Sequence, residues 1–466
     1  MIPTIGYSEN LELKENSARE KYNLPLLDRM SKLHENCSSS CKNSYISQDA
    51  DWVNIKSTIS TSVDQLAIAP GNLTKEWTDN NRKYYTYELN QPVLNFYSFI
   101  SGRYEVDRSE WIAPDEKKID IEVYYHKGHE YNIDKMVKSM KHSLDYYTTN
   151  FSPYPHAQAR IIEFPRYERF AQAFPGTMPY SESMGFIANL ETPEAIDMVY
   201  YIVAHEMAHQ WWAHQVIGAS VQGATMISET FAQYSALMVM KKEYGEDKMK
   251  EFMRYEMEKY LRGRTQETSH ELPLMLNENQ NYIHYAKGSV VMYALQDYIG
   301  EDKVNTALRN FLEDKSYQEA PYTTTLEFLD YLEAETPDSL QYLLKDMISS
   351  ITLYSNKTTS ANYKQLPDGK YEVNIDVAVE KLRADSLGTE TLIPHNDYID
   401  IGIYSEDKEE GHKYGKLILM ERVKISEPER SFTFIIDELP YEAGIDPNHL
   451  LVDRMPNDNL RKLKEK

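Results

Sequence analysis

The chain has 466 residues, of which 41% are apolar and 26% are charged, and its formal net charge is −23. This length exceeds what a single hydrophobic core usually serves, so several domains are expected. The acidic balance argues against a nucleic-acid partner, because phosphate binding needs clustered lysines and arginines.

The sequence shows no targeting or membrane-spanning segment. No apolar run approaches the roughly 20 residues needed to cross a bilayer. The N-terminus has no basic region followed by an apolar core, so it is not expected to be a signal peptide. The chain as given is therefore expected to be a soluble domain.

Two cysteines, Cys37 and Cys41, lie in a polar stretch near the N-terminus. They are too few for a four-ligand zinc site, and no second pair exists. We expect two free loop thiols here, with a small local disulfide as the alternative.

Residues 1–50 are polar and show no sustained period, so they are expected to form an extended arm or linker. A period-two alternation follows, which places one face of a strand in the core and the other in water. The alternating apolar residues are Tyr85, Tyr87 and Leu89, then Ile119, Ile121, Val123 and Tyr125. Residues 52–125 are therefore predicted to be mainly strands.

The period changes to that of a helix after residue 130. Apolar residues at helical spacing predict an amphipathic helix from Ile133 to Tyr147, and a short strand is expected near 160–164. Residues 197–214 are apolar nearly all round, which is typical of a helix buried within a domain. Further helices are expected at 224–244, 246–262, 287–299, 302–313, 323–333 and 338–349.

Strands return near Ile351. The apolar residues of 371–379 alternate strictly after a turn at 366–369, and 399–403 and 432–434 repeat the pattern. This tail is predicted to form a small antiparallel β-sandwich of about 100 residues.

The string AHEMAH at residues 204–209 falls within the predicted buried helix. His205 and His209 are four residues apart and share one helical face, so both imidazoles can point at one metal ion. Glu206 can lean over the metal without binding it, which suits a general base acting on water. Surface or capped histidines are the alternative, but so apolar a helix would bury these groups only if they are paired or metal-bound.

The next helix supplies a third ligand, Glu229, after nineteen intervening residues. A loop at about 215–223 contains two glycines, which lets this helix fold back antiparallel. Two histidines and one glutamate, with one position left for water, are the composition expected of a hydrolytic zinc centre. Taken alone, Glu229 would be an exposed helix carboxylate.

Four local motifs resemble, in the same order, those of the gluzincin aminopeptidases, the family of aminopeptidase N and leukotriene hydrolase. YSESMGF at 180–186 resembles the family's G-x-M-E-N-x-G-L, and HEMAHQWWAH at 205–214 resembles H-E-x-x-H-Q-W. SETFAQY at 228–234 resembles N-E-G-F-A-x-Y, and YAKG at 285–288 resembles Y-E-K-G. The resemblance implies one Zn²⁺ ion held by His205, His209 and Glu229.

The resemblance also implies roles for two residues that their surroundings in the sequence do not single out. Glu182 would bind the α-ammonium group of the substrate. Such a contact restricts an exopeptidase to the peptide bond next to the free N-terminus. Tyr285 would stabilise the oxyanion of the tetrahedral intermediate. Glu206 would take the proton of the attacking water and pass it to the leaving amine.

The sequence departs from the family pattern at several positions. The gap before Glu229 is one residue longer than the family's usual gap and equals that of thermolysin-like endopeptidases. Ser181 and Ser183 replace the Met and Asn that flank the amine-binding Glu, and Ser228 stands where the family has Asn. These changes leave the metal ligands intact but bear on exopeptidase specificity.

Pattern and resemblance together predict an α+β multidomain fold. Its parts are an extended arm or linker at 1–50, a partial N-terminal β-domain at 51–115, a thermolysin-like, mainly helical catalytic domain at 116–350, and a C-terminal antiparallel β-sandwich at 351–466. The sequence is most similar to a bacterial subgroup in which the peptidase follows a permease-like region of ABC-transporter type. A larger membrane polypeptide, tethered to a bacterial membrane on an unassigned side, is therefore implied.

The favoured function is a zinc-dependent aminopeptidase acting on peptides with a free N-terminus, with no nucleic-acid partner. One alternative is a zinc endopeptidase of thermolysin-like type, which the altered flanks of Glu182 and the missing upstream strands favour. Another is a non-catalytic module of a membrane transporter, against which the presence of all four candidate catalytic groups argues. Reporters with and without an N-terminal blocking group would separate the first two.

Overall fold

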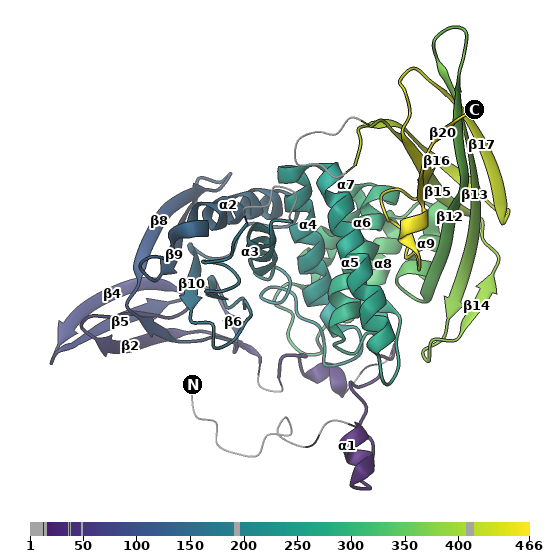
Figure 1. Cartoon of the computed structure of the whole chain (residues 1–466). Coiled ribbons are helices and arrows are strands. Elements are labelled where there is room, and N and C mark those ends of the chain that lie inside the picture. Colours follow the sequence, from purple (N-terminus) through teal and green to yellow (C-terminus); the bar gives the residue numbers. More distant parts are fainter. Residues whose placement is uncertain are drawn as a thin grey trace.

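Two groups of β-strands lie on either side of a central group of α-helices in the computed structural model (Figure 1). The structure describes residues 13, 16–35, 37, 39–47, 50–190, 196–406 and 414–466. The expectation about a signal peptide falls on residues 1–12, outside these ranges. No helix among the described residues combines the length and the apolar character needed to cross a bilayer.

The first strands form one small sheet and two short pairs. β2 (Lys56–Ser62), β5 (Arg82–Glu88) and β4 (Asn72–Asp79) pair antiparallel in that order. β1 (Trp52–Val53) pairs with β6 (Val93–Leu94), and β3 (Leu66–Ile68) pairs with β7 (Ile100–Gly102). Tyr85 and Tyr87 of β5 are buried, as their alternation predicted.

The next sheet is mixed, and its order is β11-β10-β9-β8. β8 (Glu105–Ile112) runs antiparallel to β9 (Lys118–Tyr125), whereas β10 (Gln158–Phe164) is parallel to both β9 and β11 (Thr177–Ser181). Every residue of β10 is buried, as expected for an inner parallel strand. Because β9, β10 and β11 are parallel, their carboxyl ends meet at one edge of the sheet.

Helices make up the centre of the molecule. The most apolar one, α3, is buried between α2 and α4, which fits its apolar character all round. The helices are α1 (Asn16–Lys21), α2 (Ile133–Asn150), α3 (Met198–Ala208), α4 (Phe231–Tyr244), α5 (Glu246–Gln266), α6 (Gly288–Ile299), α7 (Glu301–Lys315), α8 (Thr325–Glu335) and α9 (Gln341–Met347). Short 3₁₀ turns occur at 40–42, 130–132, 274–276, 338–340 and 456–458.

The helix predicted at 197–214 is shorter than expected. It ends at Ala208, and the chain continues in turns to Val216. Ala213 has a φ of +128°, which no helix residue adopts. The prediction was too long because Trp211 and Trp212 are fully buried in these turns, and burial alone does not distinguish a packed turn from a helix.

The C-terminal strands form two sheets. The first contains β14 (Glu390–Ile393), β13 (Tyr371–Ala384), β12 (Ile351–Gln365) and β20 (Lys464–Glu465), with β17 (Glu429–Ile436) also paired to β13. The second has the order β16 (Leu417–Ile425), β15 (Asp397–Tyr404), β18 (Glu442–Ile445) and β19 (Leu460–Lys462). The predicted turn closes the β12–β13 hairpin, where Gly369 adopts a φ of +89°.

The helices and the C-terminal sheets share one hydrophobic core. Leu344 and Met347 of α9 belong to the same buried cluster as Val373 of β13 and Ile401 of β15. Lys381 of β13 is buried at this boundary and pairs with Asp346 of α9 at 2.5 Å and with Asp397 at 2.9 Å. The packing is therefore continuous across residue 350, where the sequence predicted a domain boundary. The division of the chain into four parts stays a prediction.

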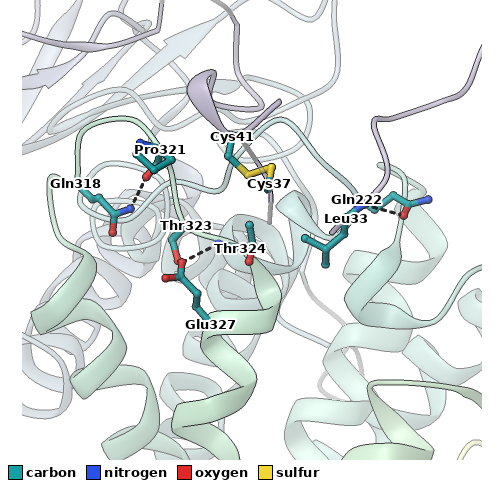
Figure 2. The surroundings of a disulfide bond; sticks show 9 residues. All are labelled: Leu33, Cys37, Cys41, Gln222, Gln318, Pro321, Thr323, Thr324 and Glu327. Atoms are coloured by element: carbon teal, nitrogen blue, oxygen red, sulfur yellow. Dashed lines mark hydrogen bonds between the residues drawn. A yellow bond between two sulfur atoms is a disulfide. The ribbon is translucent and has the colours of Figure 1, made fainter. Parts of the chain in front are cut away.

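The arm that precedes the first strands is attached to the helical centre. Cys37 and Cys41 form a disulfide with a Cα–Cα distance of 5.7 Å (Figure 2). The expectation of two free thiols was therefore wrong. The short 3₁₀ turn at 40–42 brings two cysteines four positions apart close enough to bond. Backbone hydrogen bonds from Tyr322 to Cys41 (2.7 Å) and from Ser220 to Asn43 (2.8 Å) then hold the arm.

The loop before α4 depends on a glycine. Gly223 has a φ of +87°, and an added Cβ would lie 2.2 Å from the carbonyl oxygen of Met275. Gly245 has a similar φ of +80°, but an added Cβ there meets nothing within 4 Å. An added Cβ would meet backbone strain at both positions but steric overlap only at Gly223. Comparing substitutions at the two positions therefore isolates the effect of the overlap.

We predict that Gly223→Ala lowers the free energy of unfolding by about 1–3 kcal/mol more than Gly245→Ala. Both variants carry the strain of a positive φ, but only the first forces the loop away from Met275. Urea unfolding of the two variants measures the difference. Equal losses would contradict the predicted overlap.

Candidate metal centre

His205 lies in the last turn of α3, and His209 is the residue that caps this helix, so the two histidines lie close together. Their Nε2 atoms are 3.0 Å apart, and their ring centroids are 4.6 Å apart. Both rings are buried, with exposed fractions of 7% and 6%. The Nδ1 atom of His209 lies 2.8 Å from the carbonyl oxygen of Trp212, so Nδ1 donates there and the lone pair of Nε2 points toward His205.

Glu229 joins the two histidines from the segment before α4. Its Oε2 atom is 3.3 Å from the Nε2 atoms of both His205 and His209. Glu229 lies in a π-helical turn, Met226–Thr230, and such turns occur mostly at functional sites. The geometric condition on which the sequence prediction depended, the approach of Glu229 to both rings, is met.

The electrostatics of the three groups depend on one another. Burial alone would raise the pKa of Glu229, but His209 and His205 outweigh it and hold that pKa well below its ordinary value. Burial lowers the pKa of His205, whereas Glu229 raises the pKa of His209 to about 9 against the effect of burial. The cluster therefore holds a buried carboxylate that requires a positive partner.

The donor set fits a divalent metal ion. His205, His209 and Glu229 each offer one ligand atom, and these atoms lie within 4.8 Å of one another. The Oε2 atom of Glu229 is buried and makes no hydrogen bond to the described part of the chain. Two imidazoles and one carboxylate are the protein ligands of many catalytic zinc sites. The second ring nitrogen of His209 is oriented by a backbone carbonyl, as is usual for zinc-bound histidines, whereas that of His205 is buried without a hydrogen-bond partner in the described part of the chain.

Glu206 follows the first histidine and is buried. Burial raises its pKa to about 7, an effect that His209 opposes and Glu229 adds to. Glu206 lies against Met178 and Tyr180 of β11, beside a small gap in the packing. Among the described residues, no Lys or Arg lies within 4 Å of the Glu206 carboxylate, so no such cation lowers its pKa.

Tyr285 lies on a second π-helical turn, Tyr282–Lys287, which leads into α6. Its ring centroid is 5.9 Å from that of His205. Burial raises the pKa of Tyr285, and the carboxylate of Glu229 raises it further through charge and a hydrogen bond. The hydroxyl is therefore a neutral donor at the edge of the three-ligand cluster.

Glu182 directly follows β11, and the structure does not place its carboxylate among the contacts of the three ligands. Its Oε1 atom accepts a hydrogen bond from the backbone nitrogen of Arg166 (3.1 Å) and is 3.9 Å from the Nε atom of Arg166. Its own backbone nitrogen donates to the carbonyl oxygen of Phe164. Tyr180, two residues earlier, lies beside Glu206, so β11 connects the two carboxylates.

Tyr45 is a residue of the site that the sequence analysis missed. Its backbone nitrogen donates to the carbonyl oxygen of Gly218 at 3.1 Å, which lays the arm along the loop before Glu229. Burial raises the pKa of Tyr45, Glu229 raises it further, and Ser228 lowers it. The phenol therefore lies near the metal ligand. No periodicity or motif in the arm could have indicated this.

Comparison with known proteins gives this geometry a family context. Residues 131–348 match the model of the peptidase family M1 domain. Human endoplasmic reticulum aminopeptidase 2 is 24% identical over 262 residues, which are 54% of this chain and 26% of that protein. Aminopeptidase N of Haemonchus contortus is 24% identical over 302 residues, covering 61% of this chain and 30% of that one. The matched segment is therefore similar to the M1 peptidase domain.

Solved structures show a similar multidomain α+β fold. Aminopeptidase A of Legionella pneumophila, solved in complex with aspartic acid, superposes with a TM-score of 0.58 at 15% identity, over 87% of this chain and 45% of that one. The M1 zinc metallopeptidase of Deinococcus radiodurans gives 0.51 at 18% identity, over 65% of each chain. The chain spans less than a third of the length of the two curated relatives described above.

We predict that Tyr45→Phe lowers turnover of an aminoacyl reporter by roughly two- to tenfold, the effect of losing one hydrogen bond at the site. Bound zinc should be unchanged, because Tyr45 is not a ligand. Tyr22→Phe is the matched control, since that arm tyrosine is 62% exposed. Equal activity of the two variants would remove Tyr45 from the site.

Proposed function

We propose that this chain is a zinc-dependent aminopeptidase that hydrolyses the first peptide bond of peptides with a free N-terminus. The observation that carries the proposal is the convergence of the buried His205 and His209 with the partly buried Glu229, whose ligand atoms lie within 4.8 Å of one another. The M1 match over 131–348 and the curated aminopeptidases support the same activity.

His205, His209 and Glu229 would hold the ion. When bound there, Zn²⁺ supplies Lewis-acid chemistry, lowering the pKa of water and polarising a carbonyl group. The protein's part is to present the Nε2 atoms of both imidazoles to the ion and to leave one side of the cluster open. The hydrogen bond from His209 Nδ1 to the carbonyl oxygen of Trp212 fixes the orientation of one of these rings.

Glu206 is the proposed general base. It lies one residue after His205 on the same helix, and it would lean over the ion without completing the ligand set. It would accept a proton from the attacking water and pass it to the leaving amine. Tyr285 would donate a hydrogen bond to the carbonyl oxygen as negative charge develops there, in a water-poor setting where such a bond is strong.

Glu182 is the proposed partner of the substrate's α-ammonium group. A fixed carboxylate at one end of the cleft would present the first peptide bond to the catalytic residues. Support comes from its place directly after β11, two residues from Tyr180, which lines the same small gap as Glu206. Arg166 competes for the same carboxylate, and this observation favours the second candidate, a zinc endopeptidase of thermolysin-like type that does not require a free amine.

The placement of the domain in a longer membrane polypeptide is a further part of the proposal. It has the support of the resemblance to the permease-fused subgroup. The non-catalytic transporter module is the less favoured alternative, because the ligands are accompanied by a buried carboxylate and a buried phenol suited to hydrolysis. Metal content and activity of the purified chain distinguish the two.

We predict that Glu206→Gln retains zinc and lowers turnover by about 10²–10⁴-fold or more, the usual range for loss of a general base. The amide keeps the shape of the side chain but cannot accept the proton. Metal analysis and an aminoacyl reporter assay measure the two quantities. Glu313→Gln, an exposed change on α7, should leave both unchanged. Full activity of the Glu206 variant would remove the mechanism.

We predict that Glu182→Gln raises the KM for a free aminoacyl reporter by roughly tenfold to a hundredfold, because a charge-assisted bond to the ammonium group is lost. Wild-type protein should not cleave the same reporter carrying an N-terminal blocking group. Glu168→Gln is the control, as an exposed carboxylate in the same segment. Efficient cleavage of blocked reporters by the wild type would favour the endopeptidase.

A further inference from the structure

A second group of two histidines and one glutamate lies outside the site described above. His126, His129 and Glu163 each offer one ligand atom, and these atoms lie within 4.8 Å of one another. Among the described residues, this cluster and the one on α3 are the two arrangements of this kind. Neither the motifs nor the family resemblance assigns it a role.

The fold brings these residues to the edge where the parallel strands end. His126 immediately follows β9, and Glu163 is the penultimate residue of β10, so the parallel pairing places them side by side. A turn through Gly128, with a φ of +92°, reverses the chain so that the backbone nitrogen of His129 donates to the carbonyl oxygen of His126. Both imidazoles then lie next to the same carboxylate.

The contacts around Glu163 are specific. Its Oε2 atom accepts a hydrogen bond from the backbone nitrogen of His126 at 2.6 Å and lies 3.3 Å from the Nδ1 atom of the same residue. Its Oε1 atom contacts the Nδ1 atom of His129. The two rings meet at a centroid distance of 6.2 Å. Two ring nitrogens therefore converge on one carboxylate. The His126 spacing equals the 3.3 Å found between Glu229 and its histidines, whereas His129 is in direct hydrogen-bond contact.

The burial of the group makes the charge of Glu163 significant. Its side chain has no exposed surface, whereas those of His126 and His129 are 35% and 29% exposed. Among the described residues, the ion-pair partners of Glu163 are these two histidines, with no Lys or Arg. By contrast, the partly buried Glu122 on the same sheet pairs with Arg160, and the buried Asp346 of the distant helix α9 pairs with Lys381. A buried carboxylate needs a cation to offset its desolvation.

We propose that His126, His129 and Glu163 bind a second divalent transition-metal ion, of which Zn²⁺ is the first candidate. Two imidazoles and a carboxylate suit zinc better than they suit magnesium or calcium, which prefer oxygen ligands. The half-exposed rings leave room for water to complete the coordination. The sequence predicted one ion per chain, so the proposal raises that number to two.

The position of the proposed second metal site suits a structural role. It joins the end of β9, the end of β10 and the start of α2. The next residue of β10, Phe164, accepts the backbone hydrogen bond of Glu182. An ion at Glu163 therefore fixes the sheet edge from which Glu182 projects. We assign it no catalytic role.

Metal counting on the untagged, full-length chain tests the proposal. After equilibration with a slight excess of Zn²⁺ and removal of free ion, wild-type protein should hold two equivalents, and His129→Ala should hold one. His142→Ala is the matched control, because His142 is similarly half-exposed and its Nδ1 atom lies 3.3 Å from Glu243, but no second histidine joins that pair. It should keep two equivalents. His126→Asn gives a second variant should His129→Ala fail to fold.

The outcomes separate this proposal from the peptidase function. One equivalent in wild-type protein, lost in His205→Ala but kept in His129→Ala, would overturn the second site and leave the peptidase centre in place. One equivalent that is lost in His129→Ala but kept in His205→Ala would do the reverse. As an independent measure, Zn²⁺ should raise the melting temperature of Glu229→Gln, and this increase should disappear when His129→Ala is added. No increase in Glu229→Gln would also count against the second site.

Discussion

A carboxylate buried between two buried imidazoles is the constraint on which the helical centre depends. Glu229 lies 3.3 Å from both His205 and His209. Groups of this kind cost folding free energy unless they are paired, because burial removes their hydration. The apolar packing of α3 between α2 and α4 therefore has to hold the pairing in place. This explains why α3 is apolar on nearly every face except where His205 and Glu206 occur.

The two residues that approach α3 from other segments do so from π-helical turns. Glu229 lies on 226–230 and Tyr285 on 282–287. The turns contact each other directly, because the hydroxyl of Thr230 donates to the carbonyl oxygen of His284 at 2.7 Å. Gly288 permits this approach, since an added Cβ would lie 2.6 Å from the Thr230 hydroxyl oxygen. The ligand and the phenol are thus positioned by regular backbone and not by mobile loops.

Sequence periodicity predicted the parts of the site that lie within one element or in consecutive elements. The i, i+4 spacing located His205 and His209, and a short glycine-containing loop allowed Glu229 to return to them. Tyr285 and Glu182 could be named only by resemblance, because nothing local distinguishes one tyrosine from the other 36 of the 37 in the chain. The prediction failed where tertiary packing decides. Trp211 and Trp212 are buried in turns that look helical in sequence, and the two cysteines bond because a 3₁₀ turn brings them together. Tyr45 and the cluster at Glu163 depend on contacts between segments far apart in the chain, which no local pattern records.

The shared core across residue 350 bears on how the chain responds to heat. Lys381 of β13 supplies the ammonium group that neutralises Asp346 of α9, and apolar residues from both sides fill the same interior. Separating the two parts would expose this apolar interior to water and would leave Asp346 without its counter-ion. The C-terminal strands are therefore not a removable appendage. They belong to the same cooperative folding unit as the helices, and thermal damage that begins in one part spreads to the other.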